Sequence, residues 1–367
     1  MKEIGRTLLF CSILTLLAEA GHAVELQGKV VDADTGEVLA ARVYLQGGDG
    51  RWWFCQSADP KGTAVPYSEQ WVPMEHAVDR HTTVSAHAFR VDLEPGVSEV
   101  TVERGKEYFP LTREIRLGTT DQQVTLPIQR WVNMAQRGWY SGETHVHRRL
   151  QELPNVMRAE QLNVAFPVTF WTTEAYSRPG RDPSPLRRQG PSPFGPREDR
   201  GSRVIEVDAE HVIFPRNTEY EIFSVDGQSH VLGALFILNH QSIFSQGVPP
   251  VAEVARQAHR EGALLDLDKH NWPWSMMLVP VANVDLFELS NNSIWRTQFG
   301  FRRTTIEPAP YMRVEQDSEG LTEFGWIRFG FESYYTLLNC GFRLRPTAGT
   351  ASGVHPVPLG FSRVYVN

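Results

Sequence analysis

Two histidines separated by one residue stand near the middle of the chain, in the stretch WYSGETHVHRR (residues 139–149). On an extended segment successive side chains point to opposite faces, so His145 and His147 would share one face with Glu143. Two imidazoles on one face can bind the same metal ion. Because neighbouring histidines also occur on surfaces without any metal, this pair needs support from the rest of the chain.

Further residues of ligand type stand in or beside stretches that resemble apolar strands. Glu219 lies in NTEYEIFSV, which turns back through SHVLGALFIL, and His230 stands near the start of that return. Asp268 and His270 end GALLDLDKH, and Glu288 stands near the end of VDLFEL. A single polar strand end is usually a capping or surface group. Several of them together with the histidine pair predict a cluster.

A cluster of this composition predicts a metal site. Burying carboxylates and imidazoles together costs several kcal/mol for each unpaired charge, and a cation offsets that cost. Histidine nitrogen with carboxylate oxygen suits zinc, manganese or iron. Such an ion polarises a substrate oxygen and lowers the pKa of a bound water. We therefore expect a metal-dependent hydrolase that acts on a phosphoester, carboxylic ester or carbamate of a small molecule.

The elements that position these residues fall into two predicted domains. Residues 24–130 contain short alternating strands: the DADTG turn indicates a hairpin, two further turns follow at PG and in GTTD, and strands at this spacing predict a small all-β sandwich. Residues 131–367 alternate helices with apolar strands: we expect helices at 155–162, 250–260 and 323–339, and strands at 164–169 and 264–268. This alternation predicts an α/β domain with a parallel sheet or barrel, whose reactive groups lie at the strands' carboxyl ends.

The ordered motifs from about Trp131 onward resemble those of the polymerase and histidinol phosphatase (PHP) superfamily. They are WYSGETHVHR, the hairpin around residues 219–230, AHREGALLDLDKH, DLFELSNN and PTAGTASGVHPVPLGFSRVYV. The branch that looks most similar is the CehA/McbA-type metallohydrolases, and residues 24–130 look like the carboxypeptidase regulatory-like module. The resemblance implies a distorted (β/α)7 barrel with metal ions at its strand ends. It also implies that His145 and His147 form the first motif, that Glu219 bridges metals, and that His230 and His270 are later single ligands.

The chain departs from the family pattern at two motifs. The region that usually carries a histidine after the second strand reads VTFWTTEA, and the last motif, AGTASGVH, lacks its aspartate and has its histidine, His355, shifted. One or two ions are therefore expected rather than three, with Asp268, Glu288 or His355 as substitute ligands and Asp268 as a proton shuttle. The alternative is a catalytically degenerate protein that binds a metal or another ligand. The chain also ends directly after a strand, so the barrel is expected to be truncated or to close differently.

The first residues predict export. Met1–Ala23 has a basic head, an apolar run and small residues before a cleavage point, which is typical of a signal peptide and too short for a spanning helix. We expect a periplasmic or extracellular protein with no stable membrane insertion after cleavage. The formal net charge of −7 disfavours a nucleic-acid partner. Oligomeric state is not indicated.

Three smaller features complete the predictions. The segment Ser177–Arg203 is rich in Pro, Gly and Arg, and it is either a surface excursion or a basic lid that favours an anionic substrate. The spacing of His76, His81 and His87 fits no ligand motif, so all three are expected in loops. Cys55 and Cys340 belong to different predicted domains and are expected to be buried free thiols, with a disulfide as the alternative.

Overall fold

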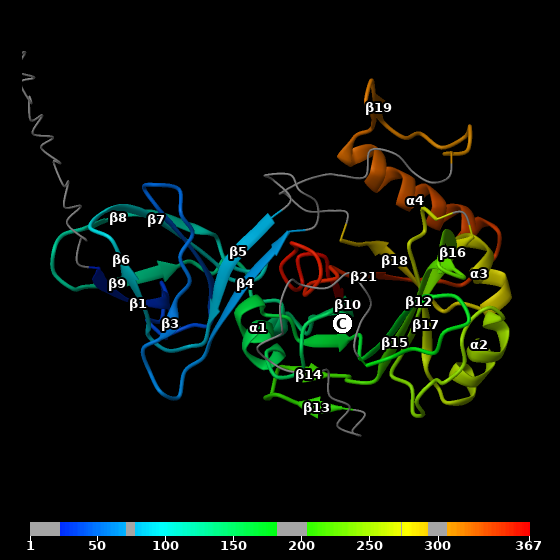
Figure 1. The fold of residues 1–367 in the computed structure, drawn as a ribbon, viewed down its shortest axis with the longest axis horizontal. Helices are drawn as coiled ribbons and strands as arrows, with labels where there is room; N and C mark the ends of the chain where they lie inside the picture. Colours follow the sequence, from blue (N-terminus) through cyan, green and yellow to red (C-terminus); the bar gives the residue numbers. More distant parts are fainter. Residues whose placement is uncertain (1–22, 71–77, 182–203, 273, 293–306) are drawn as a thin grey trace, which may run out of the picture.

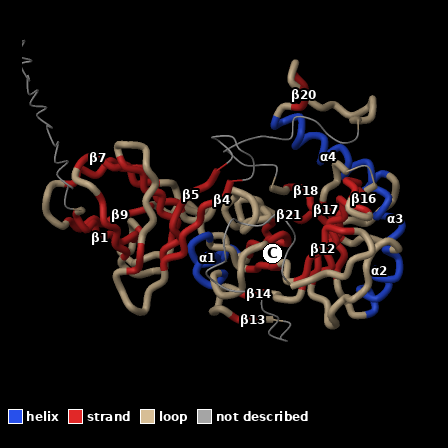
Figure 2. The backbone as a smooth tube through the Cα atoms, in the orientation of Figure 1, coloured by secondary structure: helices blue, strands red, loops and turns tan. Residues whose placement is uncertain are grey.

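Two β-rich modules lie side by side in the structure, a computed structural model (Figure 1). The tube view shows strands throughout both modules and most of the helices at the far side of the second (Figure 2). The structure describes residues 23–70, 78–181, 204–272, 274–292 and 307–367.

The N-terminal module consists of two sheets that enclose one apolar core. One sheet has the strand order β3-β6-β1-β9 and the other has the order β4-β5-β2-β7-β8. Leu26 and Phe89 from the first sheet and Val43 and Val100 from the second belong to the same buried cluster. The strands are β1 (Val24–Asp32), β2 (Ala41–Gly47), β3 (Gln56–Ser57), β4 (Ala64–Gln70), β5 (Val78–Val84), β6 (Phe89–Leu93), β7 (Gly96–Glu103), β8 (Leu111–Leu117) and β9 (Gln122–Ile128).

The hairpin predicted at the DADTG turn is wrong, and the two later predicted turns do not form hairpins either. In each case the turn carries the chain from one sheet to the other, so β1 and β2, β6 and β7, and β8 and β9 are partners across the core. At the first turn the carboxylate of Asp32 accepts hydrogen bonds from the backbone N–H of Asp34 and Thr35, both at 3.0 Å, and Gly36 adopts a φ of 75°. Alternating apolar residues face a core equally well in a hairpin and in such an arch, so the pattern could not distinguish them.

The C-terminal module holds two larger sheets and a small one. The larger sheets have the orders β13-β14-β11-β10-β22 and β12-β15-β16-β17-β18-β21, and β19 pairs with β20. The strands are β10 (Tyr140–Val146), β11 (Val164–Pro167), β12 (Phe170–Glu174), β13 (Ile205–Glu206), β14 (Val212–Ile213), β15 (Asn217–Val225), β16 (Gln228–Leu238), β17 (Leu264–Asp268), β18 (Leu286–Ser290), β19 (Gln316–Asp317), β20 (Gly320–Leu321), β21 (Arg345–Ala348) and β22 (Val364–Val366). The helices are η1 (Ala135–Arg137), α1 (Leu153–Glu160), α2 (Val251–Arg260), α3 (Ser275–Ala282) and α4 (Glu323–Asn339).

The predicted (β/α)7 barrel is wrong. Only four α-helices occur in the described ranges, and they do not separate every pair of strands. The longest strands, β15 and β16, form an antiparallel hairpin through Asp226 and Gly227, and β16 is also antiparallel to β17. An antiparallel hairpin needs only a tight turn, whereas a parallel pair needs a crossover connection. The fold is therefore mostly β, although the predicted helices at α2 and α4 and the strand at β17 are confirmed.

The six-stranded sheet separates two different environments. Along β15, Tyr220 and Ile222 belong to the apolar cluster under α2 and α3, whereas Glu219 and Glu221 point to the other face. Strand alternation produces this division, since successive side chains lie on opposite faces. The face that carries the glutamates is directed toward β10, and the candidate metal centre lies there.

The two modules are joined by buried polar contacts. The guanidinium of Arg42 on β2 pairs with Glu103 at 2.6 Å and with Glu160 of α1 at 3.0 Å. The guanidinium of Arg148 stacks on the ring of Tyr67 from β4, 3.7 Å from its centroid. Because these groups are buried, the modules pack as one unit rather than as loosely tethered domains.

Several smaller predictions have definite outcomes. His81 is buried in β5, where its Nδ1 lies 3.0 Å from Asp79, so its predicted place in a loop is wrong. Cys55 and Cys340 are both free, and Cys340 is exposed rather than buried. Residues 1–22 of the predicted signal peptide (1–23), together with His76 and most of the Pro/Arg-rich segment, lie outside the described residues. Within the described ranges, no helix is both long and apolar enough to span a membrane.

Candidate metal centre

Five of the predicted site residues gather in the interior of the C-terminal module. His145 lies on β10, His147 follows that strand directly, Glu219 lies on β15, Asp268 ends β17, and Glu288 lies on β18. Each is at most 3% exposed. Residues separated by more than 140 positions in the sequence are thus brought together by the approach of β10 to the six-stranded sheet.

The histidine pair and Glu219 form the tightest set of metal-ligand atoms. The two Nε2 atoms of His145 and His147 are 3.2 Å apart. Nε2 of His147 lies 3.3 Å from Oε2 of Glu219, and Nε2 of His145 lies 4.0 Å from Oε1 of the same residue. Ligand atoms of these three residues all lie within 4.8 Å of one another, which is close enough for one ion to bind them together.

The second ring nitrogen of His145 is directed to different residues. Its Nδ1 lies 3.0 Å from Oε2 of Glu288 and 3.9 Å from Oδ2 of Asp268. A metal-ligating histidine usually donates its other N–H to a carboxylate, which fixes the tautomer and the ring orientation. Glu288, predicted as a ligand, therefore occupies the position of a group that orients His145.

A lysine lies beside a separate group of three carboxylates. Glu219, Glu221 and Asp268 also lie within ligand distance of one another, but the ammonium group of Lys269 contacts Asp268 directly and lies 3.4 Å from Oε1 of Glu221. A fixed positive charge therefore already offsets part of the negative charge of this group. The set formed by His145, His147 and Glu219 is therefore the better place for a metal ion.

The C-terminal segment positions the histidine strand. The backbone N–H of Ala351 donates to the carbonyl of His145 at 2.9 Å, and that of His147 donates to the carbonyl of Ser352 at 2.8 Å. A side chain at Gly349 would place its Cβ 2.1 Å from Cβ of His145, so only glycine permits this approach. The rings of Phe236 and Trp171 pack against His145 and His147, with centroids 4.6 and 4.7 Å away.

Burial changes the protonation of the acidic groups. Burial, reinforced by Asp268, raises the pKa of Glu288 well above its usual range. Burial alone would raise the pKa of Asp268 as well, but Lys269 and His145 lower it overall. Burial lowers the pKa of His145, against the opposing pull of Asp268. So many buried acids are costly as anions, and a bound cation would relieve that cost. The donor set thus fits a divalent ion.

Three further predicted ligands are not among the three residues of this set. His270 is buried among the rings of Phe287, Trp326 and Phe329, with centroids 5.5 to 6.0 Å away, and burial lowers its pKa to about 4. His230 is exposed near the turn of the β15–β16 hairpin. His355 is half-buried beside Asn292, whose amide nitrogen is 3.4 Å from its ring nitrogens. Burial, followed by the charges of Lys269, His145 and His147, lowers the pKa of His355, so this ring lies beside the centre. The ligand roles of the three histidines stay predictions.

Other polar residues of the centre were missed or left unassigned from the sequence. Asp266 lies two residues before Asp268, on the same face of β17. It is fully buried, and its carboxylate oxygens lie 2.8 and 2.9 Å from the hydroxyl of Thr347, which donates to them. Glu143, expected on the face of the histidine pair, instead accepts the backbone N–H of Thr350 at 2.7 Å, and burial raises its pKa to about 8. The alternation in LDLDK signalled Asp266. Nothing in the sequence indicated that Lys269 would face Glu221.

Comparison with known proteins assigns no family to this chain. No family model matches it, and no curated protein matches it. Among solved structures, the pilus 2b backbone protein of group B streptococcus aligns over 30% of this chain and 43% of its own, with 15% identity and a TM-score of 0.22. The minor pilin GBS52 of Streptococcus agalactiae aligns over 31% of this chain and 47% of its own, with 19% identity and a TM-score of 0.20. The C-terminal domain of the shaft pilin SpaA of Lactobacillus rhamnosus GG aligns over 30% of this chain and 98% of its own, with 13% identity and a TM-score of 0.20.

These findings correct the family prediction. No family model matches the chain, and its sheets, in which β15, β16 and β17 are antiparallel, are not the barrel that the PHP resemblance implied. Membership of the PHP superfamily and of its CehA/McbA branch is therefore wrong. The family no longer supports hydrolase activity, and any such activity has to be argued from the residues of the centre. Likeness to pilins at this level assigns neither function nor partner.

Proposed function

We propose that this chain is an exported protein that binds one divalent metal ion through His145, His147 and Glu219, and hydrolyses an ester, phosphoester or carbamate of a small molecule there. The observation that carries the proposal is the double engagement of His145. Its Nε2 lies 3.2 Å from Nε2 of His147, while its Nδ1 lies 3.0 Å from the carboxylate of Glu288. One ring nitrogen thus faces the other metal-ligand atoms and the other faces a carboxylate, as is typical of a histidine that binds a metal ion.

The chemistry supplied by a divalent ion at this position is polarisation of a substrate oxygen and a lowered pKa for a coordinated water. Glu288 would hold the ring of His145 in one tautomer. Asp268, 3.9 Å from Nδ1 of His145 and bonded to Lys269, would accept a proton and return it to the leaving group. The low dielectric of the buried centre would strengthen each of these interactions.

A second candidate function is metal binding without turnover. The direct contact between Lys269 and Asp268 favours it, since a carboxylate held by an ammonium group is a weaker base. Export is proposed from the signal-peptide pattern of residues 1–23, together with a periplasmic or extracellular location.

Turnover assays on the exported, purified chain separate the two functions. The protein is stripped with a chelator, then assayed with p-nitrophenyl acetate and p-nitrophenyl phosphate as zinc or manganese is added. The proposal expects metal-dependent turnover that His147→Ala abolishes. The control is His259→Ala, since His259 lies on α2 and contacts Asp285 at 3.2 Å, outside the centre. Bound metal without any turnover would favour the second candidate.

A further inference from the structure

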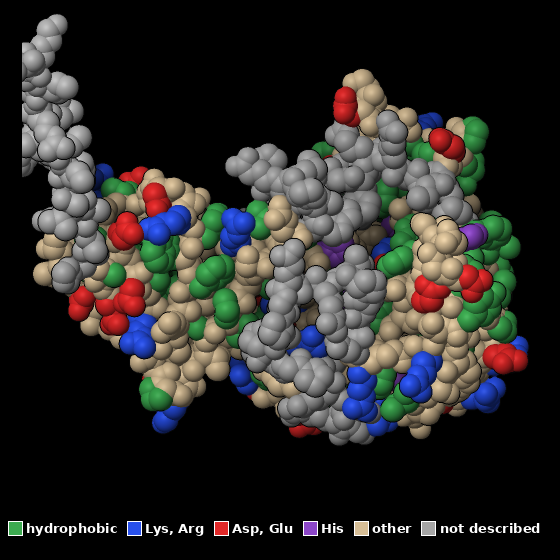
Figure 3. All heavy atoms as spheres, viewed as in Figure 1, with side chains coloured by type: hydrophobic (Ala, Val, Ile, Leu, Met, Phe, Trp, Pro, Cys, Tyr) green, Lys and Arg blue, Asp and Glu red, His purple; other side chains and the backbone are tan. Residues whose placement is uncertain are grey.

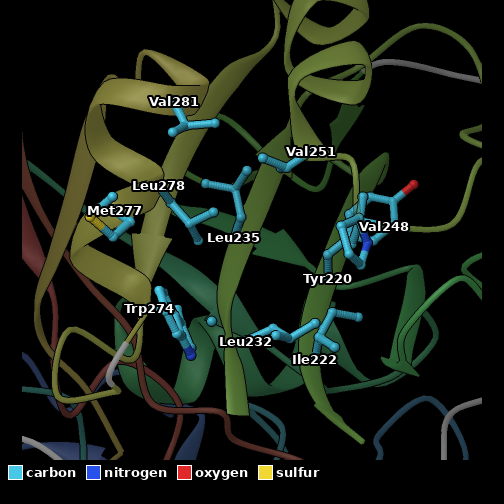
Figure 4. A pocket seen from close by; sticks show the side chains of 12 residues that line it. Tyr220, Ile222, Leu232, Leu235, Val248, Val251, Trp274, Met277, Leu278 and Val281 are labelled. Atoms are coloured by element: carbon cyan, nitrogen blue, oxygen red, sulfur yellow. The ribbon is translucent and has the colours of Figure 1, made fainter. Parts of the chain in front are cut away.

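An apolar cavity lies on the face of the six-stranded sheet opposite the candidate metal centre (Figure 4). Its volume is about 200 Å³. Tyr220 and Ile222 of β15 and Leu235 of β16 line its floor, and helices α2 and α3 form its sides. Since Glu219 and Glu221 alternate with Tyr220 and Ile222 along β15, the sheet itself separates the cavity from the metal centre.

One face of α3 is directed into the cavity rather than into the core. Trp274, Met277, Leu278 and Val281 all line it, at the spacing that places residues on one side of a helix. Trp274, Met277 and Val281 are 51%, 55% and 52% exposed, so the cavity opens to solvent beside them. Figure 3 shows hydrophobic side chains gathered at the edge of the molecule where Figure 1 places α3.

The lining offers a ligand no strong polar partner. Its side chains are aliphatic or aromatic and carry two polar groups: the hydroxyl of Tyr220, which already donates to the backbone carbonyl of Gln246 at 2.8 Å, and the indole N–H of Trp274. A ligand with charged or strongly polar groups would lose hydrogen bonds to water here without replacing them. An apolar ligand loses none and removes exposed apolar surface from water.

A glycine keeps this space open. Gly233 on β16 adopts a φ of 125°, and a Cβ there would lie 3.0 Å from Cδ1 of Leu278 and 3.4 Å from the backbone of Ser275. Any larger residue would press against α3 at the edge of the cavity. The close approach of strand and helix therefore depends on this glycine.

We propose that this cavity is a binding site for a small neutral aromatic molecule of one or two rings. A cavity of about 150 Å³ lined by Leu, Ile and Phe binds benzene in another protein, so a space near 200 Å³ holds one ring with substituents or two fused rings. The aromatic rings of Trp274 and Tyr220 lie on either side of the space and would pack against such a ligand. The site does not depend on a metal ion.

The test uses 1-aminonaphthalene, a neutral fluorescent probe with two fused rings, together with the full purified chain. Probe fluorescence is titrated for the wild type, for Met277→Lys at the mouth and for Val251→Trp, which fills the space from α2. The matched control is Phe324→Lys, because Phe324 is a 74% exposed apolar residue on α4, away from the cavity. We expect saturable binding of one probe per chain, displaced by naphthalene, at least tenfold weaker in the two cavity variants and unchanged in the control.

Three results would overturn the proposal. Binding that does not saturate, or that exceeds one probe per chain, would indicate general surface adsorption. Equal affinity in Met277→Lys, Val251→Trp and the wild type would place the probe elsewhere. Sedimentation velocity showing that the chain dimerises and that Met277→Lys alone returns it to a monomer would assign the face to a second copy. Circular dichroism of each variant establishes that a lost signal does not result from unfolding.

Discussion

Replacing His270 with phenylalanine should remove a large part of the acid sensitivity of the fold. The imidazole is 1% exposed and lies among the rings of Phe287, Trp326 and Phe329. Burial lowers its pKa from 6.5 to about 4. Between these two values the unfolded chain binds a proton that the folded chain does not, so the free energy of unfolding must fall as the pH falls.

The magnitude follows from the two pKa values. A pKa of 6.5 in the unfolded chain and about 4 in the folded chain corresponds to about 2 kcal/mol of stability lost between pH 7 and pH 4.5. Phenylalanine at position 270 would carry no proton and would pack against Phe287, whose ring lies nearly parallel at 28°. Because it also removes buried polar atoms, the variant should be at least as stable as the wild type at pH 7.

Urea denaturation at several pH values between 4.5 and 7.5, in the presence of a chelator, measures this effect. The difference in unfolding free energy between His270→Phe and wild type should grow by about 2 kcal/mol toward pH 4.5. His259→Phe is the control, since His259 is partly exposed on α2. A constant difference across this pH range would refute the reasoning, and so would a variant that is strongly destabilised at pH 7.

Three further outcomes are expected. Glu288→Gln should weaken metal binding about 10- to 100-fold by isothermal titration calorimetry while the fold stays intact, because an amide replaces the carboxyl group that orients His145; unchanged affinity would exclude that role. Gly349→Ala should lower the free energy of unfolding by about 1–3 kcal/mol, since the new Cβ would meet Cβ of His145, and a wild-type denaturation midpoint would contradict the close approach. Arg42→Met should cost about 3–5 kcal/mol by leaving the buried carboxylates of Glu103 and Glu160 without this partner, whereas a cost below 1 kcal/mol would show that the module interface does not depend on the pair.

Local patterns predicted local structure well in this chain. The apolar spacing of residues 250–260 and the glycine after them specified α2, and the turn at Asp226–Gly227 specified the hairpin of β15 and β16. The histidine pair, Glu219 and Asp268 were identified from residue type and position in strands. Each of these signals lies within about ten residues of sequence, where backbone geometry decides the outcome.

Long-range arrangement was not encoded in such patterns. The turn after β1 is equally compatible with a hairpin and with an arch between sheets, and only packing of the whole module selects the arch. His270 follows the same strand as Asp268, yet its ring enters the aromatic cluster beside α4 while Asp268 faces His145. The family resemblance implied a parallel barrel, whereas β15, β16 and β17 are antiparallel. It also implied that His230 is a ligand, whereas His230 is exposed near the turn between β15 and β16.

Metal content after dialysis tests the central claim most directly. The chain is loaded with zinc or manganese, dialysed, and measured by inductively coupled plasma mass spectrometry as wild type and as His147→Ala, Glu219→Gln, His230→Ala and His270→Ala. The account predicts one ion per chain in the wild type, in His230→Ala and in His270→Ala, and loss of the ion in His147→Ala and Glu219→Gln. Retention of the ion in the last two variants, or no bound ion in a folded wild-type chain, would contradict it.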